Sequence, residues 1–246
     1  DDMRSSPLIL LPWLLLSQGL CAQTVFRQDE LLADDRPEAW AMNHAAASTL
    51  MTAFGELPAL APGHWQAALE LTRVPRLSST QQRVGFNGSK PEDLNRSPVF
   101  GRLRLGIGLP GGWVGELGYT PPLSIDGARP RDFLALAIGH RLLERGTYTL
   151  SARAFGQHGS VQGDITCPAA LAGLIDAERN PYGCQAPSRD RVDLDYYGFD
   201  LASAWGAGPW RWHAGVGAVR TELAVQVDAL TYDVRDRSRL TVRDVL

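Results

Sequence analysis

Short runs of alternating apolar and polar residues recur through the last two thirds of the chain. In the run 99–109, leucine or isoleucine occupies every second position from Leu103, and Arg102 and Arg104 occupy two of the alternate positions. A period of two predicts a β-strand with one apolar face and one polar face. Similar runs predict strands at about 64–76, 99–109, 113–123, 131–141, 148–156 and 192–205, a seventh from Trp210 and an eighth near Leu240.

The connections between these runs alternate in length. Tight turns are expected near residues 110, 145 and 207, whereas long polar connections are expected at 77–98 and 157–191 and near 127 and 230. Short turns at one end and long loops at the other are typical of an up-and-down barrel. We therefore expect an all-β fold, an antiparallel barrel of the outer-membrane type with about eight or more strands and a short N-terminal helix.

Charged residues fall on the face of these strands opposite the leucines and aromatic residues, where a barrel would have its lumen. The expected lumen-lining residues are Glu70, Arg102, Arg104, Glu116, Arg141, Arg153, Asp200, Arg211 and His213. Arginines lining an open pore would favour anionic solutes. In an eight-stranded barrel, however, side chains fill the interior, and the same residues would then form a salt-bridged plug. We favour the plug for eight strands and leave the pore open for more.

The N-terminal third divides into two parts. Residues 1–22 carry an apolar run, 7–20, that is too short to span a bilayer, and they predict a signal peptide cleaved after Ala22. A lipoprotein signal ending at Cys21 is less favoured, because Leu20 is bulky. Residues 23–63 contain an alanine-rich stretch, 38–54, that predicts a helix in a periplasmic or lumen-plugging segment.

Composition excludes several classes of function. The formal net charge is −3, and a nucleic-acid binder should instead carry a basic surplus. After the signal, no segment is long and apolar enough for a transmembrane helix. Histidine and acidic residues do not follow metal-ligand spacing, so neither a metal nor a cofactor is expected. Cys167 and Cys184 predict a disulfide in an exported chain.

Aromatic residues stand near the expected strand ends, namely Trp113, Tyr119, Trp205, Trp210 and Trp212. With the signal, the alternation and the loop lengths, they make residues 64–246 resemble Gram-negative outer-membrane β-barrel proteins. The resemblance implies a location in the outer membrane, contact with its lipid, and recognition by the barrel-assembly machinery. It leaves open whether the chain takes small solutes or a surface ligand. Such chains usually end on an aromatic residue, whereas this one ends at Leu246, so we expect a barrel domain incomplete at its C-terminus.

Two other classes remain as alternatives. A soluble secreted β-sandwich would also alternate, but it would bury its apolar faces between two sheets. A barrel enzyme would need a histidine beside a nucleophile, yet no Gly-x-Ser-x-Gly motif is present, and His140, His158 and His213 are expected to lie apart. The one possible triad is His158 with Ser160 and Asp164, at the outer rim of the expected barrel. We expect no catalytic site.

Overall fold

The computed structural model describes residues 24–52, 56–206 and 209–246. The predicted signal peptide and Cys21 lie outside these residues, as do the last two positions of the predicted helix. None of the helices in the described ranges is long and apolar enough to cross a membrane.

Strands make up most of the described chain, which confirms the prediction of an all-β fold built from antiparallel sheets. The long strands belong to one sheet, and the short ones lie in the N-terminal segment and the long connections. The elements are β1 (Thr24–Phe26), β2 (Asp29–Leu31), α1 (Pro37–Ala47), β3 (Trp65–Arg73), β4 (Arg83–Val84), α2 (Gly85–Gly88), β5 (Lys90–Pro91), β6 (Val99–Gly108), a 3-10 turn (Pro110–Gly112), β7 (Trp113–Thr120), β8 (Arg129–Arg145), β9 (Tyr148–Gly163), β10 (Cys184–Ala186), β11 (Asp190–Trp205), β12 (Trp212–Gln226), β13 (Ala229–Thr231), β14 (Val234–Asp236) and β15 (Arg239–Val245).

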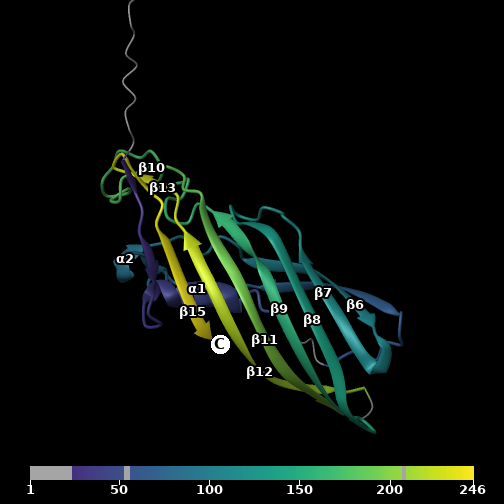
Figure 1. The fold of residues 1–246 in the computed structure, drawn as a ribbon. Helices are drawn as coiled ribbons and strands as arrows, with labels where there is room; N and C mark the ends of the chain where they lie inside the picture. The colour runs from purple at the N-terminus through teal and green to yellow at the C-terminus, as the bar shows by residue number, and fades with distance from the viewer. Residues whose placement is uncertain (1–23, 53–55, 207–208) are drawn as a thin grey trace, which may run out of the picture.

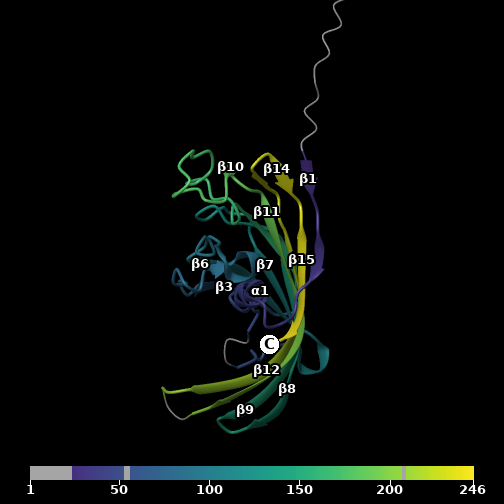
Figure 2. The same cartoon turned by 90° about the vertical axis from the view of Figure 1, so that its left-hand side faces the viewer.

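Within the described residues the large sheet has nine strands, in the order β2-β15-β12-β11-β9-β8-β7-β6-β3. From β3 to β15 its neighbours are consecutive antiparallel strands, at the eight places that the alternation predicts. Figures 1 and 2 show these strands tilted and curved around one concave side. The tight turns lie at one end of the sheet, hereafter the turn end, and the long connections at the other, the loop end.

Several strands are longer than predicted. β9 reaches Gly163, where the sequence predicts that a loop begins at residue 157, because β11 pairs with β9 as far as Asp190 opposite Gly163. β12 likewise continues to Gln226, beyond the point where its alternation weakens. Pairing with neighbouring strands therefore extends both strands past their own sequence signal.

No sheet in the described part of the chain closes into a barrel, so closure is not shown. The sheet is open, with β3 at one edge and β2 at the other. β15 pairs with β12 on one side and, over Arg239–Thr241, with β2 in parallel on the other. Because β2 occupies that stretch of the β15 edge, β3 has no partner there.

The N-terminal segment begins at the loop end. β1 runs parallel to β14 and β2 runs parallel to β15, and β15 descends from the loop end toward the turn end. The chain then enters the concave side as α1, which Figure 2 shows inside the curve of the sheet. There Met42 and Ala46 pack against Leu194 and Leu223 of the sheet.

The helix α1 is shorter than predicted. It begins with Pro37 in its first turn, a favoured position for proline, but Arg36 rather than Asp35 precedes it as N-cap. It ends at Ala47, well before the predicted end at residue 54. Beyond it, the carbonyl groups of Thr49, Met51 and Thr52 accept hydrogen bonds from arginines of the sheet. These tertiary bonds stabilise the non-helical course of the chain.

Candidate functional site

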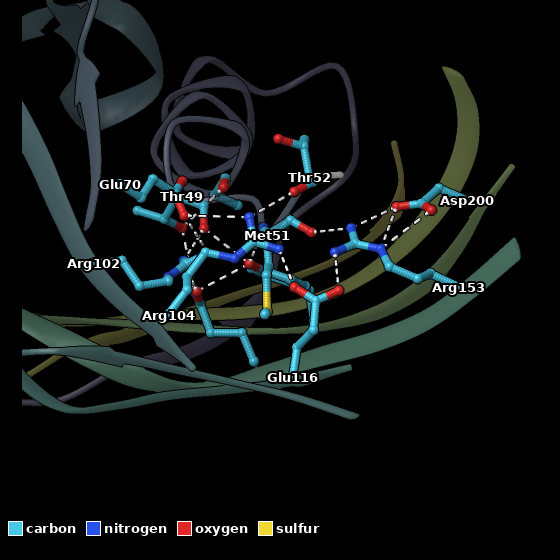
Figure 3. A network of polar contacts seen from close by, with 12 residues as sticks. Thr49, Met51, Thr52, Glu70, Arg102, Arg104, Glu116, Arg153 and Asp200 are labelled. Carbon is cyan, nitrogen blue, oxygen red and sulfur yellow. Dashed lines mark hydrogen bonds and ion pairs between the residues drawn. The ribbon is translucent and has the colours of Figure 1, made fainter. Parts of the chain in front are cut away.

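Six of the charged residues predicted to line a lumen meet on the concave face of the sheet (Figure 3). They come from five strands, and the period of two along each strand directs them to the same side. Three are arginines and three are carboxylates, so their formal charges balance. We call them the charge cluster: Glu70 of β3, Arg102 and Arg104 of β6, Glu116 of β7, Arg153 of β9 and Asp200 of β11.

Arg153 links one half of the cluster. Its Nη1 lies 3.0 Å from Glu116 Oε1, and its Nη2 lies 2.7 Å from Asp200 Oδ2. Glu116 also pairs with Arg104 through its other oxygen. The Arg153 side chain is only 3% exposed, so these pairs are shielded from water and weakly screened.

Arg102 and Arg104 flank Glu70 in the other half of the cluster. Glu70 Oε2 lies 3.6 Å from Arg102 Nη1 and 3.7 Å from Arg104 Nη1. All three side chains are buried, and the Arg102 guanidinium lies over the ring of Phe100, 4.9 Å from its centroid. Burying charges is costly unless they are paired, and here each charge has a partner of opposite sign.

The arginines also bind the backbone of the N-terminal segment. Residues 37–52 and 56–57, hereafter the inner segment, follow the concave face. Arg102 Nη2 donates to Thr49 O at 2.5 Å, Arg104 Nη1 to Thr52 O at 2.9 Å, and Arg153 Nη2 to Met51 O at 2.7 Å. The charge cluster therefore fixes the inner segment to the sheet (Figure 3).

Tyr196 and Gln157 complete this contact, although neither residue was among those predicted from the sequence. The Tyr196 hydroxyl accepts the Met51 N–H at 2.8 Å and lies 2.8 Å from Thr49 O. Gln157 Oε1 accepts from Arg102 at 2.6 Å, and its amide nitrogen donates to Leu194 O. Gln157 was missed because it lies in the predicted loop. Tyr196 was missed because attention fell on its neighbour Tyr197, which belongs to the outward apolar face of the predicted strand.

Two glycines leave room for the cluster. A Cβ at Gly118 would lie 2.8 Å from Arg102 Cδ, and one at Gly139 would lie 2.7 Å from Arg153 Cγ and 2.9 Å from a methyl carbon of Leu57. All three distances are too short for real carbon contacts, so a side chain at either position would displace the arginine beside it.

The remaining predicted lumen residues lie nearer the turn end. Arg141 donates to Leu57 O through Nε at 3.0 Å and pairs with Glu56 at 3.3 Å. Arg211 also pairs with Glu56, although 41% of its side chain is exposed. These two arginines bind the last part of the inner segment rather than the charge cluster. His213 is exposed and does not join either group.

The opposite, convex face of the sheet is apolar. Its leucines, isoleucine and phenylalanine at the middle of the strands are between 40% and 64% exposed: Leu103, Leu105, Leu117, Leu134, Leu136, Ile138, Phe199 and Leu201. The predicted interface aromatics Trp113, Tyr119, Trp205, Trp210 and Trp212 are also exposed. All but Tyr119 lie toward the turn end, where Trp65 joins them.

The long connections are joined at the loop end. The structure contains the predicted disulfide between Cys167 and Cys184. Lys90 pairs with Glu92 at 2.8 Å and donates to Thr166 O at 2.6 Å, which ties the connection between β3 and β6 to the disulfide loop. Burial raises the pKa of Glu92 to about 7, against the opposing effect of Lys90.

α1 is attached to the same region through Glu38. Glu38 accepts from the Arg36 guanidinium at 3.1 Å and from the backbone N–H of Asn87 at 2.6 Å. Burial alone would raise the pKa of Glu38, but these hydrogen bonds outweigh it and lower that pKa.

Two of the histidines considered as catalytic candidates contact groups other than the expected ones. His140 Nε2 contacts Gly111 O at 3.0 Å, and His158 Nδ1 lies 3.0 Å from Asp195 rather than beside Asp164. Asp164 instead pairs with Arg96. Among the described residues, no group of three or more histidine, cysteine or acidic side chains is arranged to hold a metal ion.

Comparison of the chain with family models, curated proteins and solved structures finds no match to any of them.

Proposed function

We propose that this chain is an outer-membrane β-barrel protein whose inner segment plugs the lumen, and that it acts as a structural or surface-interaction protein rather than as an open channel. The observation that carries the proposal is the division of one curved sheet into an apolar convex face and a charge-paired concave face. Lipid-facing and lumen-facing residues alternate in this way along the strands of membrane barrels.

The convex face supports the membrane location. A β-sandwich would cover its apolar side with a second sheet. In the described residues the other sheets are a four-stranded and a two-stranded one formed by the N-terminal segment and the long connections, and the convex leucines stay exposed. Tryptophans near the turn end fit the interface between lipid and water, where aromatic residues gather in such proteins. The long connections, with their disulfide, would then face the outside.

The charge cluster supports a plug rather than an anion-selective pore. A pore that selects anions needs cationic groups accessible to the solute. Here Arg102, Arg104 and Arg153 are buried, each is paired with a carboxylate, and each donates to a backbone carbonyl of the inner segment.

The membrane location is tested by a charged substitution on the convex face. Leu136→Arg, at 64% exposure, should destabilise a membrane barrel by about 2–4 kcal/mol if the position is near the bilayer midplane. In a soluble protein an exposed substitution should change stability by less than about 0.5 kcal/mol. Ile175→Arg, in the disulfide loop and fully exposed, is the matched control and should be neutral in either case. For a membrane barrel we also expect the unaltered protein to fractionate with the outer membrane. Its migration in detergent gels should change on heating.

The plug is tested by planar-bilayer conductance of the full-length protein. We expect no steady conductance from the unaltered protein. Replacing Arg102, Arg104 and Arg153 together with Ser should release the inner segment and open a conductance that favours cations, because Glu70, Glu116 and Asp200 remain. A steady anion-selective conductance in the unaltered protein would contradict the plug and favour a channel.

A further inference from the structure

A cavity of about 600 Å³ lies between α1, the loop-end halves of the strands and the long connections. This volume is within the range of small-molecule sites, about 300–1,000 Å³. It lies on the loop-end side of the charge cluster, and Thr49 and Arg102 belong to its wall. The concave face therefore has two zones, a charged one that binds the inner segment and a second one that surrounds open space.

The second zone is largely apolar. α1 contributes Met42 and Ala45, and the strands contribute inward-facing Phe100, Val192, Leu194 and Leu240. The cavity also reaches Leu69 and Leu71 beside the unpaired edge of β3, so it opens sideways as well as toward the long connections. Transfer of a hydrocarbon chain from water to an apolar lining of this kind is favourable.

Each arginine in the wall is already paired with a carboxylate. Arg36 pairs with Glu30 and Glu38, Arg96 pairs with Asp93 and Asp164, and Arg102 pairs with Glu70. An anionic head group would have to compete with a carboxylate for any of these three arginines. The wall thus favours a ligand without net charge.

Two buried hydroxyl groups in the wall lack a protein partner. Thr120 Oγ1 and Ser238 Oγ each make no hydrogen bond in the structure, although Thr120 is 5% and Ser238 is 8% exposed. A buried polar atom without a partner costs about 1–3 kcal/mol. A ligand that offers a hydroxyl or ester oxygen would satisfy one of these groups when the Thr120 or Ser238 side chain turns toward the open space, because protein atoms cover each hydroxyl oxygen in the structure.

We propose that this cavity binds an uncharged single-chain amphiphile, with its hydrocarbon chain against the apolar wall and its hydroxyl or ester head hydrogen-bonded to Thr120 or Ser238. The chain enters beside the free edge of β3, where Leu69 and Leu71 continue the apolar surface. Binding depends on the cavity and its opening at the β3 edge, and therefore does not rest on the membrane location proposed above.

The test is equilibrium binding of radiolabelled 1-hexadecanol to the purified full chain held in amphipol, with palmitate at alkaline pH as the charged comparison. We expect saturable binding of one hexadecanol per chain and at least tenfold weaker binding of palmitate. Ala45→Phe places a ring in the cavity and should weaken hexadecanol binding at least tenfold. Ala67→Phe adds the same ring to the exposed side of β3, outside the cavity, and should leave binding unchanged.

Thr120→Val tests the head-group contact with little change in shape. Loss of one hydrogen bond should weaken hexadecanol binding about three- to tenfold. This variant keeps the proposal testable if Ala45→Phe fails to fold, as judged by circular dichroism. Absence of saturable binding, equal binding of palmitate, or equal loss in Ala45→Phe and Ala67→Phe would each overturn the proposal.

Discussion

Replacement of Arg153 by Met is the most direct perturbation of the contact between sheet and inner segment. The substitution keeps a long unbranched side chain but removes the guanidinium that bonds Glu116, Asp200 and the Met51 carbonyl. Glu116 retains Arg104, whereas Asp200 forms no ion pair other than that with Arg153 in the described residues. Removing one partner of a buried ion pair costs about 3–5 kcal/mol. We therefore expect a loss of about 4 kcal/mol in the free energy of unfolding.

The assay is urea unfolding of the protein reconstituted in lipid vesicles, followed by tryptophan fluorescence. Adding Asp200→Asn to Arg153→Met removes the uncompensated charge and should recover at least about 1 kcal/mol. Arg191→Met is the matched control, because Arg191 pairs with Asp193 at 2.6 Å but has a side chain 45% exposed. Exposed pairs contribute about 0–1 kcal/mol. Equal losses for Arg153→Met and Arg191→Met, or no recovery in the double variant, would refute the reasoning.

Tyr196→Phe leaves the buried Met51 amide without its acceptor and should cost about 1–3 kcal/mol in the same unfolding assay; an unchanged midpoint would show that the hydroxyl contributes nothing. Cys167→Ser should lower the free energy of unfolding by about 3 kcal/mol, because the disulfide closes a loop between residues 17 apart. Thermal unfolding with and without reductant measures this loss, and an unaltered protein that unfolds at the same temperature in reductant would contradict it. The pKa of Glu92 is raised from 4.5 to about 7, so protonated Glu92 contributes its full stability below pH 4.5, and this contribution is lost as the pH rises through 7. Glu92→Gln should therefore remove this part of the pH dependence of the unfolding temperature between roughly pH 4 and 8, and an unchanged pH dependence would argue against it.

The strands were largely predictable because their signal is local. Alternation along a strand records which side chains face each side of the sheet, and it placed β3, β6 and β7 to within a few residues. The extensions of β9 and β12 were not predictable in the same way, because pairing with β11 supports residues whose own pattern is weak. The end of α1 was missed for a related reason: hydrogen bonds from distant arginines decide where the chain leaves the helix.

The sequence predicted which charged residues share the face of the candidate site, but not which groups they bind. Alternation assigned nine residues to one face, and the structure brings six of them together. It could not show that the inner segment accepts hydrogen bonds from three of them, because backbone carbonyls carry no sequence signal. Gln157 and Tyr196 belong to the same contact through positions that only the fold relates.

The sequence by itself determined the strands, the two chemical faces of the sheet and the cysteine pair, since each depends on residue type and short spacing. Only the tertiary structure decided that the sheet of the described residues stays open, that β2 runs beside β15 from the loop end, and that α1 lies within the curve. It alone also separated a charged zone from an apolar cavity on the concave face. These features arise from contacts between residues far apart in the chain, whose free energies no local pattern records.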